Sequence, residues 1–93
     1  MCGIAAIFAY RAAAPAVDRA ELARITRAME KRGPDGEGLW QSADGMIGFG
    51  HRRLAILDPS PSGAQPMGHG PHGVTSAPAP DARFVITFNG EIY

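Results

Sequence analysis

The spacing of apolar residues predicts a strand at the start of the chain. Residues 3–10 form a short apolar run of isoleucine, phenylalanine, tyrosine and alanine, and its length suits a buried strand better than a helix. Residues 11–17 lack such a pattern and contain Pro15, so a loop is expected after the strand.

The next apolar stripe predicts one amphipathic helix. Asp18, followed three residues later by Glu21, matches the capping-box pattern of a helix start. Apolar side chains then recur at helical spacing, at Leu22, Ile25 and Met29. Gly33-Pro34 is a helix-stop signal, so the helix is expected to end near Arg32.

Four later segments have the composition of strands, namely Leu39–Gln41, Met46–Phe49, Arg53–Leu57 and Arg83–Phe88. Ala43-Asp44-Gly45 suits a hairpin turn between the first two, because Asp-Gly tolerates positive φ. Residues 59–82 are rich in proline and glycine and show no packing stripe, which predicts one long loop.

Length and charge narrow the possible classes of protein. A chain of 93 residues allows one domain at most. Its 45% of apolar residues is an ordinary globular fraction. The 9 basic residues balance 9 acidic ones, which argues against nucleic acid or an anionic membrane as the main partner.

The cellular compartment is indicated by what the sequence lacks. No apolar run approaches the roughly 20 residues of a membrane span. The first residues lack the basic region of a secretory signal. The lone cysteine excludes a disulfide framework. A cytoplasmic protein without a membrane partner is therefore expected.

Cys2 is the most unusual candidate for chemistry. Removal of the initiator methionine would leave Cys2 with a free α-amine beside its thiol. A terminal amine can serve as the base for its own side-chain nucleophile, so one residue would hold both groups. The alternative is that Cys2 packs as a small hydrophobe at a strand start.

Two further segments hold candidate binding groups. The amide of Asn89 and the backbone N–H of Gly90 could both point at one oxygen, as in an oxyanion hole, although Asn-Gly is also a common turn. Arg53 could bind a substrate carboxylate, and strand alternation places its neighbour Arg52 on the opposite face. Both arginines could equally be solvated surface charges.

No metal site is expected. The three histidines are His51, His69 and His72, and no second thiol or nearby carboxylate completes a set of three or four ligands.

Five short strings, in this order along the chain, resemble class II glutamine amidotransferases of the asparagine synthase branch. They are Met1-Cys2-Gly3-Ile4, Arg32-Gly33-Pro34-Asp35-Gly36, the string from His51 to Asp58, Gln65-Pro66 and the string from Phe88 to Tyr93. The resemblance covers the whole chain but only the front part of the glutaminase domain. Residues 2–93 are thus expected to be a partial domain of this kind.

The resemblance implies an α+β fold, that of the N-terminal-nucleophile hydrolases, with stacked antiparallel β-sheets and flanking helices. It implies that Cys2 attacks the side-chain amide of L-glutamine and that Asn89 and Gly90 form the oxyanion hole. Arg53 would hold the α-carboxylate of glutamine and Glu91 its α-ammonium. The residues after Arg53, namely Leu54, Ala55, Ile56 and Leu57, would line the pocket.

The resemblance also implies partners outside this sequence. A second, aspartate partner of the glutamine ammonium would lie beyond Tyr93, and the synthetase domain is absent. That domain would bind ATP and magnesium and use the ammonia to convert L-aspartate to L-asparagine, and the full-length enzyme could form a homodimer. This chain itself would need no cofactor.

Two alternatives stand beside this interpretation. The chain could be a truncated, non-catalytic fragment, or it could belong to a related amidotransferase with a different ammonia acceptor. Glucosamine phosphate synthase shares the start but typically has tyrosine where Pro34 stands, so Pro34 favours the asparagine synthase branch.

Overall fold

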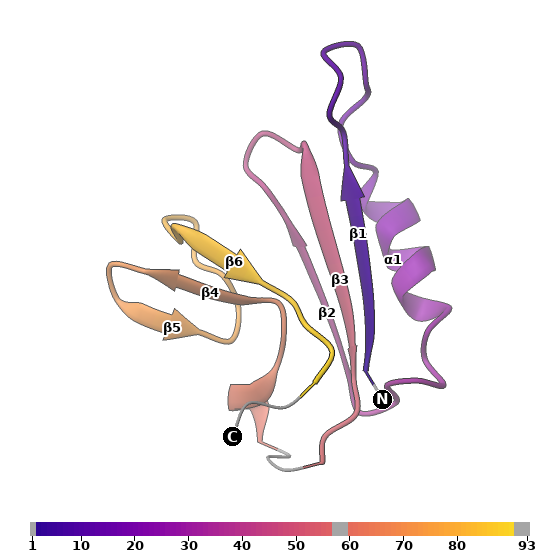
Figure 1. The fold of residues 1–93 in the computed structure, drawn as a ribbon, viewed down its shortest axis with the longest axis vertical. Helices are drawn as coiled ribbons and strands as arrows, with labels where there is room; N and C mark the ends of the chain where they lie inside the picture. The colour runs from indigo at the N-terminus through magenta and orange to yellow at the C-terminus, as the bar shows by residue number, and fades with distance from the viewer. Residues whose placement is uncertain (1, 57–59, 91–93) are drawn as a thin grey trace.

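The computed structural model describes residues 2–56 and 60–90, and in these residues it is an α+β structure with two small antiparallel sheets and one α-helix (Figure 1). The first sheet has the strand order β1-β3-β2. Its strands are β1 (Gly3–Phe8), β2 (Gly36–Gln41) and β3 (Ile47–Arg53). The helix α1 (Arg19–Arg27) covers one face of this sheet and contacts all three of its strands.

The second sheet has the strand order β5-β4-β6 and lies beyond β2 (Figure 1). Its strands are β4 (Met67–Gly70), β5 (Gly73–Thr75) and β6 (Phe84–Ile86). A short 3₁₀ turn, Pro61–Gly63, precedes β4. The prediction of one unstructured loop over 59–82 was therefore wrong, because glycine-rich strands such as β4 show no apolar alternation.

The helix starts where the sequence predicts and ends earlier. The Asp18 carboxylate accepts a hydrogen bond from the N–H of Ala20 at 2.9 Å, which confirms Asp18 as the N-cap. The helix ends at Arg27, and residues 28–32 form successive turns rather than the predicted last helical turn. The N–H of Gly33 still bonds to the carbonyl of Met29, so the chain turns toward β2 before the proline.

Close packing of α1 on β3 decides which helix residues are buried. Leu22 and Thr26 are fully buried, whereas Ile25, which was predicted to join the buried stripe, is 41% exposed. A Cβ on Gly50 would lie only 1.9 Å from Thr26 Oγ1, so the strand glycine makes room for the threonine. The Thr26 hydroxyl donates to the Leu22 carbonyl at 2.7 Å, which satisfies the buried polar group.

The hairpin between β2 and β3 confirms the predicted turn. Gly45 has φ +72°, and Asp44 accepts hydrogen bonds from the Ser42 hydroxyl and the Met46 N–H. β3 then runs without interruption to Arg53. The predicted strand over Arg53–Leu57 was wrong: its described residues after Arg53 leave the sheet, and Leu57 lies outside the described residues.

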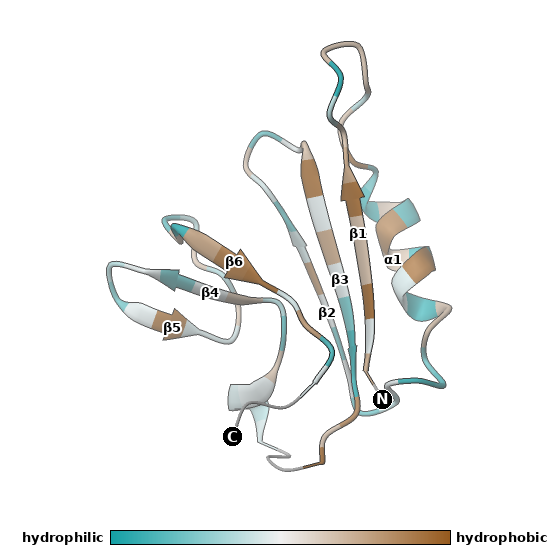
Figure 2. Cartoon of the chain, in the orientation of Figure 1, coloured by the Kyte–Doolittle hydropathy of each residue, from teal (hydrophilic) through white to brown (hydrophobic). Residues whose placement is uncertain are grey.

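The described core is small for the apolar content of the chain. Its buried apolar side chains are Ala5, Ala9, Val17 and Leu22. Large apolar side chains remain exposed on β1, after β3 and on both edges of the second sheet, where Figure 2 shows apolar stretches of ribbon; examples are Ile4, Phe8, Ile56, Phe84 and Ile86. Such faces are normally covered by another layer of a domain.

Candidate active site

Strand alternation in β3 separates two sets of side chains. Gly48 and Gly50 face α1, as does Arg52, whose Nε donates to the Gly33 carbonyl at 2.8 Å. His51 and Arg53 face the other way, toward the segments around the second sheet. Arg52 and Arg53 therefore lie on opposite faces, as the alternation predicts.

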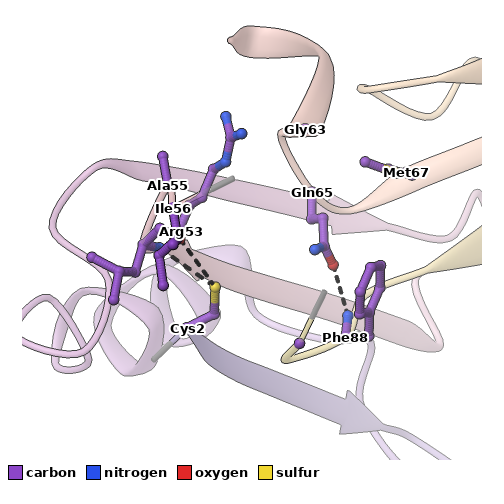
Figure 3. A pocket seen from close by; sticks show the side chains of 10 residues that line it. Cys2, Arg53, Ala55, Ile56, Gly63, Gln65, Met67 and Phe88 are labelled. Atoms are coloured by element: carbon purple, nitrogen blue, oxygen red, sulfur yellow. Dashed lines mark hydrogen bonds between the residues drawn. The ribbon is translucent and has the colours of Figure 1, made fainter. Parts of the chain in front are cut away.

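A pocket of about 110 Å³ lies at the end of this sheet, on the face of Arg53 (Figure 3). We call it the cysteine pocket; it is lined by Cys2, Arg53, Leu54, Ala55, Ile56, Gly63, Gln65, Met67, Phe88 and Gly90. Six of these ten residues are sequence-predicted site residues, from the start, middle and end of the chain. The fold thus gathers Cys2, Arg53, the three residues after it and Gly90 in one place.

The pairing of β1 with β3 sets the position of Cys2. Gly3 pairs with Arg52, so extending the register by one residue places Cys2 opposite Arg53. The Cys2 Sγ lies 3.4 Å from the Leu54 nitrogen, which donates to it, and 3.9 Å from the Leu54 oxygen (Figure 3). The thiol is half-buried and borders the pocket.

The segment Arg32–Gly36 fastens the backbone around the pocket. Arg32 Nε donates to the Cys2 carbonyl at 3.3 Å. The N–H of Asp35 donates to the Arg53 carbonyl at 2.9 Å, and the Asp35 carboxylate accepts the Ala55 N–H at 2.9 Å. These bonds replace the sheet ladder after Arg53 and explain why β3 stops there. Three residues that line the pocket, Cys2, Arg53 and Ala55, are thereby bonded to one segment.

The two arginines have different surroundings. Arg52 is buried, donates to Gly33 and lies 3.7 Å from the Glu37 carboxylate, so its role is to hold the sheet and the turn together. Arg53 lines the cysteine pocket, and its Nη1 donates to the Ser60 carbonyl at 2.6 Å. Its guanidinium packs against Gly63, where a Cβ would lie 2.3 Å from Nη2. Arg53 is thus a cation oriented at the pocket wall.

The Asn89-Gly90 segment follows β6 and reaches the pocket through Gly90. Gly90 has φ +156° and lines the pocket, whereas Asn89 is exposed and is not among the lining residues. Leu57 and Glu91, two predicted substrate-binding residues, lie outside the described residues. The structure thus brings Gly90, but not the Asn89 side chain, to the pocket.

Two buried polar residues near the pocket had no predicted role. The Gln65 Oε1 accepts the N–H of Phe88 at 2.7 Å (Figure 3), and His51 Nε2 lies 3.2 Å from the Phe88 carbonyl. Burial lowers the pKa of His51 below its ordinary value; the charge of Arg53 acts in the same direction and the bond to Phe88 opposes both. The only sequence signal for this pair was their presence in the strings that carry the resemblance.

Comparison with known proteins decides the family. The family model described as "Glutamine amidotransferase domain" matches residues 1–93. The chain belongs to the glutamine amidotransferase domain family. The resemblance found in the sequence is thereby confirmed, and the pocket around Cys2 is the candidate active site of an amidotransferase domain.

Several asparagine synthetases resemble this amidotransferase domain along its whole length. The Mycobacterium tuberculosis protein named "Putative asparagine synthetase (glutamine-hydrolyzing)" is 42% identical over 100 aligned positions. "Putative asparagine synthetase (glutamine-hydrolyzing) 2" of Methanocaldococcus jannaschii is 38% identical to the chain. "Asparagine synthetase (glutamine-hydrolyzing) 1" of Arabidopsis thaliana is 37% identical. All of this chain is covered in each case, but it spans only 14%, 19% and 14% of these relatives, respectively. By their names, members of this family are enzymes.

No solved structure matches the chain. Within residues 2–56 and 60–90, no helix has the length and apolar character needed to cross a membrane. In the same residues, no three histidine, cysteine, aspartate or glutamate side chains gather as metal ligands would.

Proposed function

We propose that this amidotransferase domain is the front part of the glutaminase of a glutamine-hydrolysing asparagine synthase. The observation that carries the proposal is the cysteine pocket, where the second residue of the chain meets Arg53 and Gly90. A thiol, a cation and the backbone of a glycine lie beside one cavity. Hydrolysis of an amino-acid amide needs a nucleophile, a partner for the carboxylate and a donor to the oxyanion, and residues of these kinds can supply them.

The proposed nucleophile is the Cys2 thiolate after removal of Met1. Its own α-amine takes the thiol proton, and the sulfur attacks the side-chain amide carbon of glutamine. The amine returns the proton to the leaving nitrogen, so ammonia departs and a γ-glutamyl thioester remains. Water then hydrolyses the thioester to glutamate and frees the thiol.

Three groups are proposed to act on negative charges of the substrate and of the tetrahedral intermediate. The Gly90 N–H, together with the Asn89 side-chain amide, stabilises the oxyanion of the tetrahedral intermediate. Arg53 binds the α-carboxylate, because its guanidinium is held at the pocket wall by the Ser60 carbonyl. The described residues Leu54, Ala55 and Ile56 form the adjoining wall, and Leu57 and Glu91 are proposed from the resemblance alone.

The fate of the ammonia is proposed from the resemblance described in the sequence analysis, together with the relatives' names. A synthetase part would bind ATP and magnesium and transfer the ammonia to L-aspartate. The exposed apolar faces of β1 and β6 are consistent with further layers of the same domain packing on them. A cytoplasmic location and a homodimeric assembly complete the proposal.

A chimera tests the glutaminase assignment. These 93 residues replace the matched segment of the Arabidopsis relative, where the alignment extends over 93 positions. We expect asparagine synthesis from either glutamine or ammonia. Cys2→Ala should abolish glutamine-dependent synthesis and leave ammonia-dependent synthesis intact, since only the former uses the thiol.

Two results would contradict the proposal. One is a chimera that uses ammonia but never glutamine. The other is Cys2→Ala with undiminished glutamine-dependent synthesis. The acceptor is tested separately by the coding sequence after Tyr93: an in-frame ATP-binding synthetase region supports aspartate amidation, and an in-frame region of another kind contradicts it.

A further inference from the structure

Both backbone polar groups of Phe88 are held by buried side chains from other parts of the chain. Gln65 Oε1 accepts the Phe88 N–H at 2.7 Å, and His51 Nε2 lies 3.2 Å from the Phe88 oxygen. His51 is 1% exposed and Gln65 8% exposed. Because a carbonyl only accepts, the His51 Nε2 must carry the proton in this contact.

The two side chains are themselves fixed by the fold. His51 stands in β3, where it pairs with Ile4 of β1 and Gly38 of β2. The backbone of Gln65 lies so close to Gly38 that a Cβ added to Gly38 would be 1.8 Å from the backbone carbonyl oxygen of Gln65. His51 in β3 thus presents a donor, and Gln65 in the loop packed against β2 presents an acceptor, to the backbone of Phe88.

Phe88 directly precedes the segment that the proposed function assigns to the oxyanion. Within residues 2–56 and 60–90, Asn89 and Gly90 make no hydrogen bond of their own, and both are exposed. The two bonds to Phe88 are therefore the nearest described anchors of the Gly90 N–H. Oxyanion donors act only when held to within about 0.5 Å of the productive geometry.

We propose that His51 and Gln65 are positioning residues that hold Phe88 and thereby set the position of the Asn89-Gly90 segment, whose Gly90 lines the cysteine pocket. This inference rests on the proposed function. It assigns a role to two residues that the proposed mechanism does not use; His51 lies outside the cysteine pocket, and Gln65 lines it. Both side chains act on the transition state through the backbone of Phe88.

A misplaced oxyanion donor changes kcat rather than substrate affinity. Removal of one donor costs on the order of 100- to 1000-fold in kcat. Loosening the donors should cost less, so we expect Gln65→Met and His51→Leu each to lower kcat for glutamine hydrolysis by roughly 10- to 100-fold. KM for glutamine should stay within about twofold, because Arg53 is untouched.

Conservative variants distinguish the two hydrogen bonds to Phe88 from the packing of the His51 and Gln65 side chains. Gln at position 51 can still donate to the Phe88 carbonyl, and Glu at position 65 can still accept its N–H. His51→Gln and Gln65→Glu should therefore recover most of the lost kcat. Gln41→Met is the matched control, since it removes the bond from Gln41 Nε2 to the Val17 carbonyl, away from the pocket.

The measurements are made in the chimera described above. Alkylation of Cys2 by iodoacetamide forms no oxyanion, so its rate should be unchanged in Gln65→Met and His51→Leu while glutamine hydrolysis falls. Ammonia-dependent synthesis should also be unchanged. Gln41→Met should lower the melting temperature without lowering kcat.

This role of His51 and Gln65 is overturned by any of three results in a chimera that hydrolyses glutamine. The first is a kcat that is unchanged in both His51→Leu and Gln65→Met. The second is a rise in KM for glutamine in place of the fall in kcat. The third is a loss of the Cys2 alkylation rate that parallels the loss of glutamine hydrolysis. Failure of the proposed function looks different, because the unsubstituted chimera, or its Cys2→Ala variant, would then give the contradictory results stated for that proposal.

Discussion

Replacing Arg53 by alanine is predicted to weaken glutamine binding without harming the synthetase reaction. The guanidinium lines the cysteine pocket, where its Nη1 already donates to the Ser60 carbonyl at 2.6 Å. The change removes the only cation among the pocket-lining residues, which all belong to the described part of the chain. The α-carboxylate of glutamine would then lose its partner.

The size of the effect follows from the kind of contact. Losing a partly buried, charge-assisted pair costs about 2–5 kcal/mol, which corresponds to roughly 30- to 5000-fold in kcat/KM. The carboxylate contact is present in both the bound substrate and the transition state. Most of the loss should therefore be a higher KM for glutamine rather than a lower kcat.

Arg52→Ala provides the matched control. It removes a buried guanidinium that donates to the Gly33 carbonyl at 2.8 Å, on the opposite face of the sheet. Hydrogen bonds from charged groups contribute about 1.5–3 kcal/mol, so Arg52→Ala should lower the melting temperature of the chimera. Its KM for glutamine should change little.

The assay is the glutamine dependence of asparagine synthesis, with ammonia as the alternative nitrogen donor. Arg53→Ala should leave the ammonia reaction at the parent rate. A larger increase in KM for glutamine with Arg52→Ala than with Arg53→Ala would refute the assignment and the register on which it depends.

Three further predictions follow from packing, titration and the small core. Gly50→Ala should destabilise the chimera by about 1–3 kcal/mol, because the added Cβ would meet Thr26 Oγ1. The loss of stability should be smaller in a Thr26→Ala background, and equal losses in both backgrounds would argue against the contact. The pKa of His51 is lowered in the folded chain, so as pH falls below about 6.5 the unfolded chain binds a proton at this residue before the folded chain does. The free energy of unfolding should therefore fall toward acid pH, and it should fall less in His51→Gln. The same pH dependence of unfolding in both proteins would show that His51 does not cause the fall. The 93-residue chain alone should lack efficient glutaminase activity, since few apolar side chains of residues 2–56 and 60–90 are buried. A dispersed amide NMR spectrum together with rapid glutamine turnover would contradict this.

Local signals in the sequence were sufficient for several elements. Asp18 starts the helix through its own carboxylate, and the Asp44-Gly45 turn is specified by short-range hydrogen bonds and positive φ. The strand at residues 3–10 was predicted from its apolar run and is seen as β1. The helix start and the turn depend on neighbours along the chain, so their residues suffice to predict them. β1 pairs with the distant β3, and its apolar run predicts the strand but not its partner.

Elements that depend on distant partners were predicted less well. Thr26 replaces Ile25 in the core because Gly50 of β3 admits the helix closely, and helical spacing alone does not reveal that glycine. The strand predicted after Arg53 fails because Asp35, from a separate segment, takes the Ala55 N–H. β4 and β5 contain several glycines, so their pairing leaves no apolar alternation to detect.

The residues of the candidate site also fall into a predicted group and a group that had no predicted role. Cys2, Arg53 and Gly90 were predicted as site residues and lie at one pocket. His51 and Gln65 were part of recognised strings but had no predicted role. Their shared partner is the backbone of Phe88, and a contact to backbone leaves no mark on the sequence at position 88.

The identity of the nucleophile is the central claim, and labelling tests it most directly. The purified chimera is treated with an electrophilic analogue of glutamine, with and without excess glutamine, and its N-terminal peptide is analysed by mass spectrometry. We predict that Met1 is absent, that Cys2 carries one label, and that glutamine protects it. A retained Met1, or an unlabelled Cys2 in a preparation that hydrolyses glutamine, would contradict the account.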